Sequence, residues 1–205
     1  MASSPKRTQI RFSQPDDVFQ LKISLLDIRP LIYRRIQVRQ DLPLSDLHRV
    51  IQIAMGWTDT HLHQFKVGDV AFGGPTSELW PAPIDYRRVT LNQILRKPGA
   101  SCIYEYDFGD CWKHLVELED QLPKEQGTPP IPRCVAGERA CPREDVGGPP
   151  GYREFLDAIQ NPKSPDDERF RQWDGVEFDP EAFDIERVNR RLSRIASLPG
   201  RRRGR

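Results

Sequence analysis

Hydrophobic and polar residues alternate along the first part of the chain. In residues 18–26 apolar side chains occupy every second position, and residues 32–38 largely repeat the pattern. This period is typical of β-strands that bury one face. The two runs are separated by a short turn containing Pro30. Adjacent alternating runs with such a short connection predict an antiparallel hairpin.

After the hairpin the hydrophobic period changes to that of an α-helix. Over residues 43–55 the apolar side chains follow the i, i+3, i+4, i+7 rule, and Gly56 is a typical stop signal. The same reasoning predicts the remaining elements, namely strands at 61–67, 70–72, 101–106 and 113–119, a helical turn at 89–95, and helices at 152–160, 165–173 and 180–195.

The order of these elements predicts the fold class. Strands come first, one helix follows, more strands come next, and helices end the chain, which favours α+β over a repeating βαβ pattern. We expect a mixed or antiparallel sheet of hairpins with packed helices, similar to an α/β roll, and a helical C-terminus. Residues 17–197 should form a single α+β domain between a flexible N-terminus, residues 1–16, and a disordered basic tail, residues 198–205.

Length and composition agree with one domain and limit its location. A domain of about 150 residues buries roughly 70% of its unfolded surface. No run of about 18 apolar residues exists, so we expect no membrane span. The first residues lack the apolar core of a signal peptide, and the four cysteines are sparse for a disulfide scaffold. We therefore expect a cytoplasmic protein with free thiols.

The charges nearly cancel but are unevenly distributed. The formal net charge is +1, whereas residues 185–205 contain eight arginines and one glutamate. A basic helix and tail of this kind can contact nucleic-acid phosphates, and Arg190, Arg191 and Arg194 are the candidate residues. The alternative is an ordinary solvated helix face.

The sharpest polar cluster lies between two predicted strands. Asp107, Asp110 and His114 fall within eight residues around Gly109. The two aspartates are typical of a tight turn, where they accept hydrogen bonds from backbone N–H groups. Alternatively, the three side chains form a catalytic set that binds a hard cation or performs acid–base chemistry. The sequence leaves both interpretations open.

A pair of histidines precedes this cluster in the chain. In a strand, residues two apart point to the same face, so His61 and His63 are expected to lie side by side. Paired imidazoles are common metal ligands, and the alternative is a half-exposed strand face with hydrogen-bonded histidines.

Residues 134–151 read as one long irregular segment, and such segments in compact domains often carry function. Three glycines and three prolines make its second half rigid, and backbone donors there would suit an anion. The alternative is a loop that simply packs on the sheet. Cys134 and Cys141 are too far apart for the usual zinc spacing. The candidate ligand residues of this loop are Arg139, Cys141, Glu144, Asp145, Gly147, Gly148 and Tyr152.

Three stretches of this sequence, in order and spacing, resemble the Ri-plasmid ORF-three-like family. They are residues 21–65, with Met55-Gly56-Trp57 and His61-Leu62-His63, residues 104–114, with Tyr106-Asp107-Phe108-Gly109-Asp110, and residues 139–152, with Asp145-Val146-Gly147-Gly148-Pro149-Pro150-Gly151-Tyr152. The resemblance implies an α+β roll-like fold and an association with plasmids and insertion sequences, and it implies no settled activity. Some relatives carry a cysteine where this chain has Val146, which argues against a shared cysteine-based metal site.

Two functions are favoured by the sequence, beside a third in which residues 141–151 form one wall of a pocket for a small molecule or a protein. The first is a non-catalytic binding or accessory module of plasmids or transposable elements, with nucleic acid or another protein as its partner. The alternative is a metal-dependent hydrolase or nuclease, in which a divalent metal is the cofactor and the Asp and His cluster supplies the ligands.

Overall fold

A single large β-sheet organises the molecule. The computed structural model describes residues 17–75, 82–123, 131–160 and 178–196. The sheet has eight strands in the order β5-β4-β3-β6-β7-β1-β2-β8, and all neighbours are antiparallel except β4 and β5. The strands are β1 (Val18–Leu25), β2 (Tyr33–Arg39), β3 (His63–Val67), β4 (Val70–Gly73), β5 (Ile84–Asp85), β6 (Ser101–Tyr106), β7 (Trp112–Leu122) and β8 (Arg133–Glu138).

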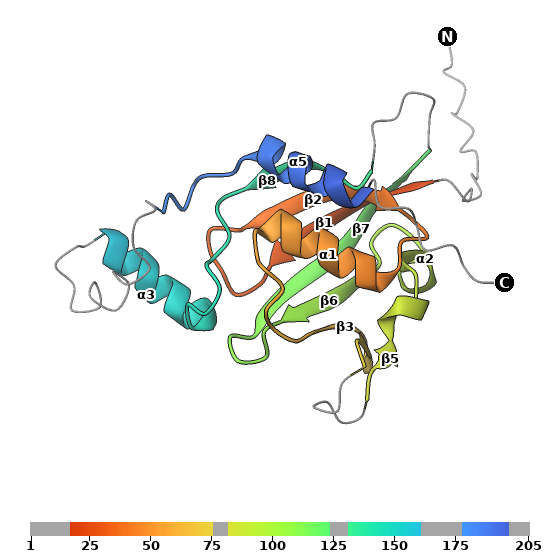
Figure 1. The fold of residues 1–205 in the computed structure, drawn as a ribbon, viewed down its shortest axis with the longest axis horizontal. Helices are drawn as coiled ribbons and strands as arrows, with labels where there is room; N and C mark the ends of the chain where they lie inside the picture. The colour runs from red at the N-terminus through yellow and green to blue at the C-terminus, as the bar shows by residue number, and fades with distance from the viewer. Residues whose placement is uncertain (1–16, 76–81, 124–130, 161–177, 197–205) are drawn as a thin grey trace, which may run out of the picture.

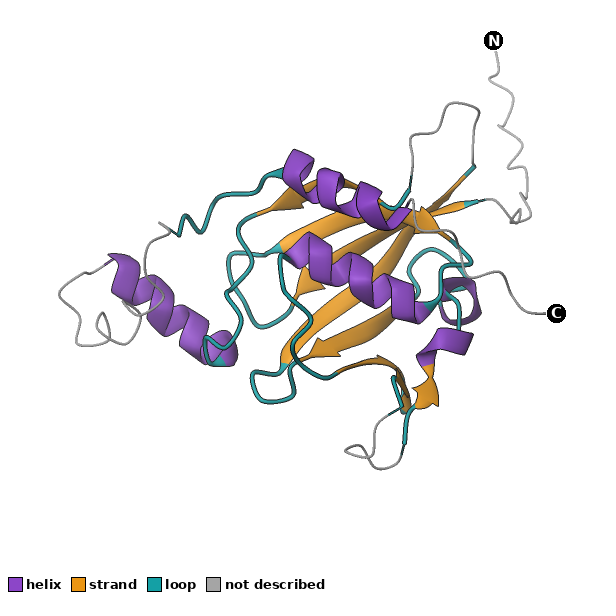
Figure 2. Ribbon diagram, in the orientation of Figure 1, coloured by secondary structure: helices purple, strands orange, loops and turns teal. Residues whose placement is uncertain are grey.

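Helices cover one face of this sheet. Figures 1 and 2 show α1 and α5 lying across the same face, while α3 lies beside the end of the sheet at which the β6–β7 turn is found. The helices are α1 (Leu44–Met55), α2 (Leu91–Ile94), α3 (Gly148–Gln160) and α5 (Ile185–Ala196), with one 3-10 turn, η1 (Tyr86–Arg88). The α+β prediction with a helical C-terminus is thus confirmed. None of the helices in the described ranges has the length and apolar character that a membrane span requires.

The core forms where the alternating strands meet the amphipathic helices. Phe19, Leu21, Ile23 and Leu25 of β1 have no exposed surface, because their face of the strand lies under the helices. At the predicted stop, Gly56 adopts φ 95°, and its N–H donates to the Gln52 carbonyl. Glycine reaches this left-handed conformation without the strain of a Cβ atom.

The main departure from the predicted elements is β8. It occupies part of the segment expected to be irregular, where it pairs with β2 through residues such as Cys134, opposite Ile36. Gly137 is needed within it, because a Cβ atom there would lie 2.6 Å from the Phe183 ring. Other boundaries differ as well: α3 begins at Gly148 rather than at 152, β3 at His63 rather than at 61, and α5 at Ile185 rather than at 180. The helix expected at residues 165–173 lies outside the described residues.

Arg34 is a buried charge in the middle of β2. Its side chain is 2% exposed, and the guanidinium donates to four backbone carbonyls. The acceptors are Ala54 at 2.9 Å, Tyr33 at 2.7 Å, and Glu138 and Arg139, each at 2.8 Å. The Phe183 ring lies 4.1 Å from the guanidinium carbon. One side chain therefore joins the end of α1, β2 and the end of β8.

The outer edge of β8 is occupied by a side chain of α5. The Asn189 carboxamide accepts from the Cys134 N–H at 2.7 Å and donates to the Cys134 carbonyl at 2.9 Å. These are the two backbone groups that a further strand would use. The helix is thereby fixed to the sheet edge by polar contacts as well as by Val188 and Leu192, which are buried in the core.

Candidate functional site

Three connections meet at one end of the sheet. They are the segment between α1 and β3, the β6–β7 turn, and the loop between β8 and α3. Each places one metal-ligating side chain in a shared cluster, formed by His61, Asp107 and Asp145. Both aspartates have positive φ, 58° and 60°, which non-glycine residues seldom adopt. We call this cluster the three-loop site.

The geometry of His61 is the notable feature of the three-loop site. Its Nε2 atom lies 3.1 Å from Asp145 Oδ1 and 3.7 Å from Asp107 Oδ2. The atom is buried, yet neither contact satisfies hydrogen-bond geometry. Asp107 Oδ2 is too distant for a hydrogen bond, and Asp145 Oδ1 is close enough but poorly aligned with Nε2. The three side chains could hold a metal ion between them, with Nε2 and one oxygen of each carboxylate as ligands.

Asp107 serves two purposes with its two oxygens. Oδ1 accepts from the backbone N–H groups of Gly109 at 3.0 Å and Asp110 at 3.3 Å, as the turn interpretation predicts. Oδ2 faces His61 instead. Asp107 can therefore stabilise the turn with one oxygen and bind a metal ion with the other.

Asp110 ties the β6–β7 turn to the start of α3. Its Oδ2 accepts from the Gly147 N–H at 3.1 Å. The backbones come so close that a Cβ atom on Gly148, whose φ is 66°, would lie 2.4 Å from the Asp110 carbonyl oxygen. Because Pro149 and Pro150 lack N–H groups, the start of α3 offers few donors, which disfavours the expected anion cradle.

Glu144 ties the same loop to the segment that carries His61. One carboxylate oxygen accepts from the Thr58 N–H at 3.1 Å and the Thr58 hydroxyl at 2.5 Å. The other accepts from the Tyr106 hydroxyl at 2.5 Å. Burial, followed by this hydrogen bond, raises the pKa of Tyr106 to about 12, so the phenol remains a donor. In addition, Trp57 donates from its indole to the Pro142 carbonyl at 2.9 Å.

Other predicted site residues lie apart from the three-loop site. His114 is fully buried, with its ring 5.2 Å from Trp57 and 5.4 Å from Tyr104. Burial lowers its pKa to about 4. His114 is therefore a neutral core residue and does not belong to the cluster that contains Asp107.

Of the predicted ligand residues in the loop before α3, some lie at the three-loop site and others do not. Glu144, Asp145 and Gly147 reach the three-loop site, whereas Arg139 pairs with Glu181. Burial raises the pKa of the Cys141 thiol to about 12, which leaves it protonated and unreactive. Tyr152 is 1% exposed and packs near Phe155.

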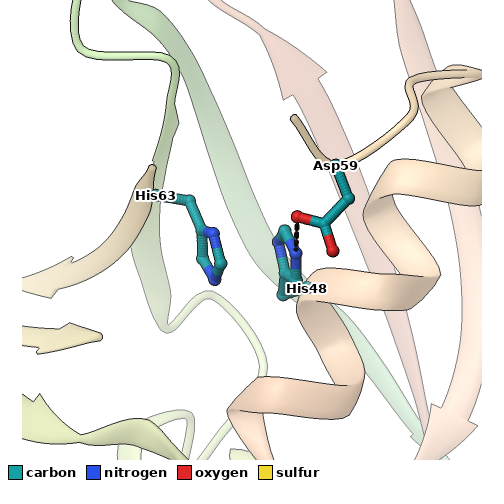
Figure 3. A group of neighbouring side chains, drawn as sticks. All are labelled: His48, Asp59 and His63. Carbon is teal, nitrogen blue, oxygen red and sulfur yellow. Dashed lines mark hydrogen bonds and ion pairs between the residues drawn. The ribbon is translucent and has the colours of Figure 1, made fainter. Parts of the chain in front are cut away.

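His63 belongs to a second cluster, which the sequence did not reveal (Figure 3). Its ring stacks on that of His48 from α1, with centroids 3.4 Å apart and an interplanar angle of 2°, and Asp59 lies beside them. A metal ion lies in the plane of each imidazole that binds it. Two parallel planes at this separation share no such point, so one ion cannot bind both rings in this arrangement. Burial lowers the pKa of each histidine to about 4, which keeps both neutral.

Comparison with known proteins gives the family. The model of the plasmid pRiA4b ORF-3-like proteins matches residues 17–187. The chain belongs to this family. It is 38% identical over 182 residues to the uncharacterized protein y4hQ of Sinorhizobium fredii, covering 88% of this chain and 93% of that protein.

A similar protein of known structure has the same fold. The crystal structure of MM3350, a protein of unknown function from Methanosarcina mazei Go1, superposes with a TM-score of 0.75 at 35% identity. The match covers 84% of this chain and 98% of that one. The resemblance expected from the three sequence motifs is therefore confirmed, and the descriptions of both relatives name no activity.

The arginines of α5 lie on a different part of this family member. Arg190 and Arg194 are exposed, while Arg191 is half-buried. Arg190 lies 3.8 Å from an Asp184 carboxylate oxygen and 3.6 Å from one of Glu186. Part of the positive charge on this helix is thus balanced by carboxylates at its start.

Proposed function

We propose that this pRiA4b ORF-3-like protein binds a divalent transition-metal ion through His61, Asp107 and Asp145. The observation that carries the proposal is the buried Nε2 of His61, which has no hydrogen-bond partner and is flanked by two carboxylates. The three ligands come from three separate connections, and additional hydrogen bonds hold those connections together. Such outer contacts are typical of metal centres.

The donor set indicates which ions to test. One imidazole nitrogen and two carboxylate oxygens suit Zn²⁺, Mn²⁺ or Fe²⁺ better than Mg²⁺, which prefers oxygen ligands and retains its waters. Two carboxylates also neutralise a divalent charge. Because Asp145 is 71% exposed, the solvent side of the ion would keep positions for water.

A metal-dependent hydrolase is a second candidate, and the open side of the three-loop site favours it. An ion with protein ligands on one side and water on the other can generate a nucleophile. The neighbouring carboxylates of Asp110 and Glu144 add negative charge, however, which disfavours phosphodiester substrates. A neutral ester or amide is the better probe, and the nuclease form of this hypothesis predicts Mn²⁺-supported cleavage of DNA.

An accessory role for plasmids or transposable elements rests on the family and on the arginine-rich α5. We infer that any nucleic-acid contact uses Arg190, Arg191 and Arg194, and that Arg190 would have to exchange its contacts with Asp184 and Glu186 for a phosphate. Titration with DNA and RNA from 50 to 200 mM salt tests this, since phosphate contacts give an affinity that falls steeply with salt. No binding at 50 mM would exclude nucleic acid as the partner.

Isothermal titration of chelator-treated protein with Zn²⁺, Mn²⁺ and Mg²⁺ tests the metal proposal. We expect one Zn²⁺ or Mn²⁺ per chain and little Mg²⁺ binding. Asp107→Asn keeps an oxygen for the turn but loses a charged ligand, and Asp145→Asn loses the exposed ligand. Each should weaken binding by more than about 100-fold, beyond the change typical of outer-shell residues.

The matched control is Asp69→Asn, in the exposed β3–β4 turn, which should bind as the wild type does. Absence of stoichiometric binding, or equal affinity in all three variants, would overturn the proposal.

A further inference from the structure

A closed ring of hydrogen bonds includes two residues of the second cluster, His48 and Asp59. The Asp59 N–H donates to Gln52 Oε1 at 3.0 Å, and Gln52 Nε2 donates to the Tyr104 hydroxyl at 3.0 Å. The Tyr104 hydroxyl lies 2.8 Å from His48 Nδ1, and His48 Nε2 lies 2.7 Å from Asp59 Oδ1. The ring therefore begins and ends at Asp59.

The direction of each hydrogen bond in the ring is determined. Gln52 cannot be rotated, because its oxygen is required by the Asp59 N–H. Tyr104 is fully buried and already accepts from Gln52, so its single proton goes to His48 Nδ1. His48 Nε2 then carries the ring proton and donates to the Asp59 carboxylate. His48 consequently has no free lone pair for a metal ion.

The ring fixes the backbone on both sides of His61. Two residues before it, Asp59 is held in a left-handed conformation with φ 62°. Two residues after it, the His63 ring is stacked on His48, a member of the ring. Between them, the Thr60 N–H donates to the Tyr106 hydroxyl at 3.0 Å. The short segment thus reaches the three-loop site with little freedom in its backbone.

We propose that the ring of Asp59, Gln52, Tyr104 and His48 positions His61 for the metal ion, and that none of its members binds the ion. This inference rests on the proposed function. Preorganised ligands lose less conformational freedom on binding, and removal of such outer contacts typically weakens metal affinity by about 10- to 100-fold. The ring is buried within the fold except at Asp59, whose side chain is 51% exposed and open to substitution.

The experiment compares Zn²⁺ affinity in three ring variants. Tyr104→Phe removes the hydroxyl that joins Gln52 to His48, and we expect about tenfold weaker binding. Asp59→Ala removes the acceptor for His48 and should weaken binding similarly. Asp59→Asn retains an acceptor oxygen at Oδ1 and should restore affinity to near the wild-type value.

Comparison of Asp59→Ala with Asp59→Asn distinguishes a positioning role of Asp59 from direct binding of the ion. If the Asp59 carboxylate were a ligand, its replacement by an amide would weaken Zn²⁺ binding. Tyr33→Phe, which removes a hydroxyl bonded to Glu138 on the surface, is the matched control. The Co²⁺ form gives a second readout: we expect the same visible absorption bands in Asp59→Asn and the wild type. Circular dichroism verifies folding, and the exposed Asp59 variants remain informative if Tyr104→Phe does not fold.

The possible results are distinguishable. If Asp59→Asn binds as weakly as Asp59→Ala, Asp59 is itself a ligand and the inference is overturned. If Tyr104→Phe and Asp59→Ala both bind like the wild type, the ring does not position His61. If the proposed function itself is wrong, the titrations of Asp107→Asn and Asp145→Asn already show it, because their metal affinity would equal that of the wild type.

Discussion

Replacing Arg34 with methionine should lower the free energy of unfolding by several kcal/mol, because it removes the hydrogen bonds of a buried guanidinium. The guanidinium donates four hydrogen bonds at 2.7–2.9 Å, and bonds to charged groups contribute about 1.5–3 kcal/mol each. The gross loss is therefore about 6–12 kcal/mol. The desolvation penalty of the buried cation, also several kcal/mol, disappears with it. We expect a net loss of about 4 kcal/mol, against a typical domain stability of 5–15 kcal/mol.

Arg35, the next residue, is the control for this prediction. It lies on the opposite face of β2, and its guanidinium makes a two-pronged contact with Glu119 at 2.5 and 2.8 Å. Its side chain is 31% exposed, and such surface pairs are worth about 0–1 kcal/mol. Arg35→Met should therefore cost about 1 kcal/mol or less.

Urea unfolding followed by tryptophan fluorescence measures both variants. Arg34→Lys should recover less than half of the loss, because an ammonium group cannot match four carbonyls arranged around a planar fork. If Arg34→Met and Arg35→Met lose equal stability within 1 kcal/mol, the assignment of Arg34 as the residue that joins α1, β2 and β8 is refuted.

Two further predictions concern pH and backbone approach. Burial lowers the pKa of three histidines from 6.5 to about 4, those of His48, His63 and His114. Between those values the unfolded chain binds more protons, so stability falls as pH falls from 6.5 to 4, by about 3 kcal/mol for His114. His114→Leu should show a shallower decline in urea unfolding at pH 7, 6 and 5; an unchanged slope would contradict this. Gly148→Ala places a Cβ atom 2.4 Å from a carbonyl oxygen and should lower the free energy of unfolding by about 3 kcal/mol in the same assay. Gly68→Ala, where φ is 57° and no atom lies within 4 Å of the added Cβ, should lower it by about 1 kcal/mol. Equal losses in the two variants would exclude the steric explanation.

The parts of the fold that the sequence predicts are those in which local periodicity reflects burial. The strand β1 alternates because only one of its faces meets the helices, and α1 has an apolar stripe for the same reason. The strand β8 gives no such pattern, since Gly137, which packs against Arg34 and Phe183, interrupts the alternation of apolar side chains. Its partner lies about a hundred residues earlier in the chain, and local patterns carry no information about such pairings.

The candidate site was predictable as separate residues and not as an arrangement. Asp107 and Asp145 were identified individually, but the contact of each with His61 depends on how three connections converge. Two features of the sequence do indicate the observed arrangement. His114 shares the period-two face of Trp112 and Val116, which predicts burial. On α1, His48 and Gln52 are polar residues four apart on the buried side, which indicates an internal hydrogen-bond network.

The contact between Asn189 and Cys134 has a consequence for how molecules of this protein meet one another. A sheet grows when the free N–H and C=O groups of its last strand pair with another chain. In β8 the N–H and C=O groups of Cys134 are already bonded to the Asn189 carboxamide. Another chain that pairs there must first displace α5, and with it the buried side chains of Val188 and Leu192. Self-association through this edge is therefore coupled to the loss of native packing, so that the last helix protects the sheet against its own copies.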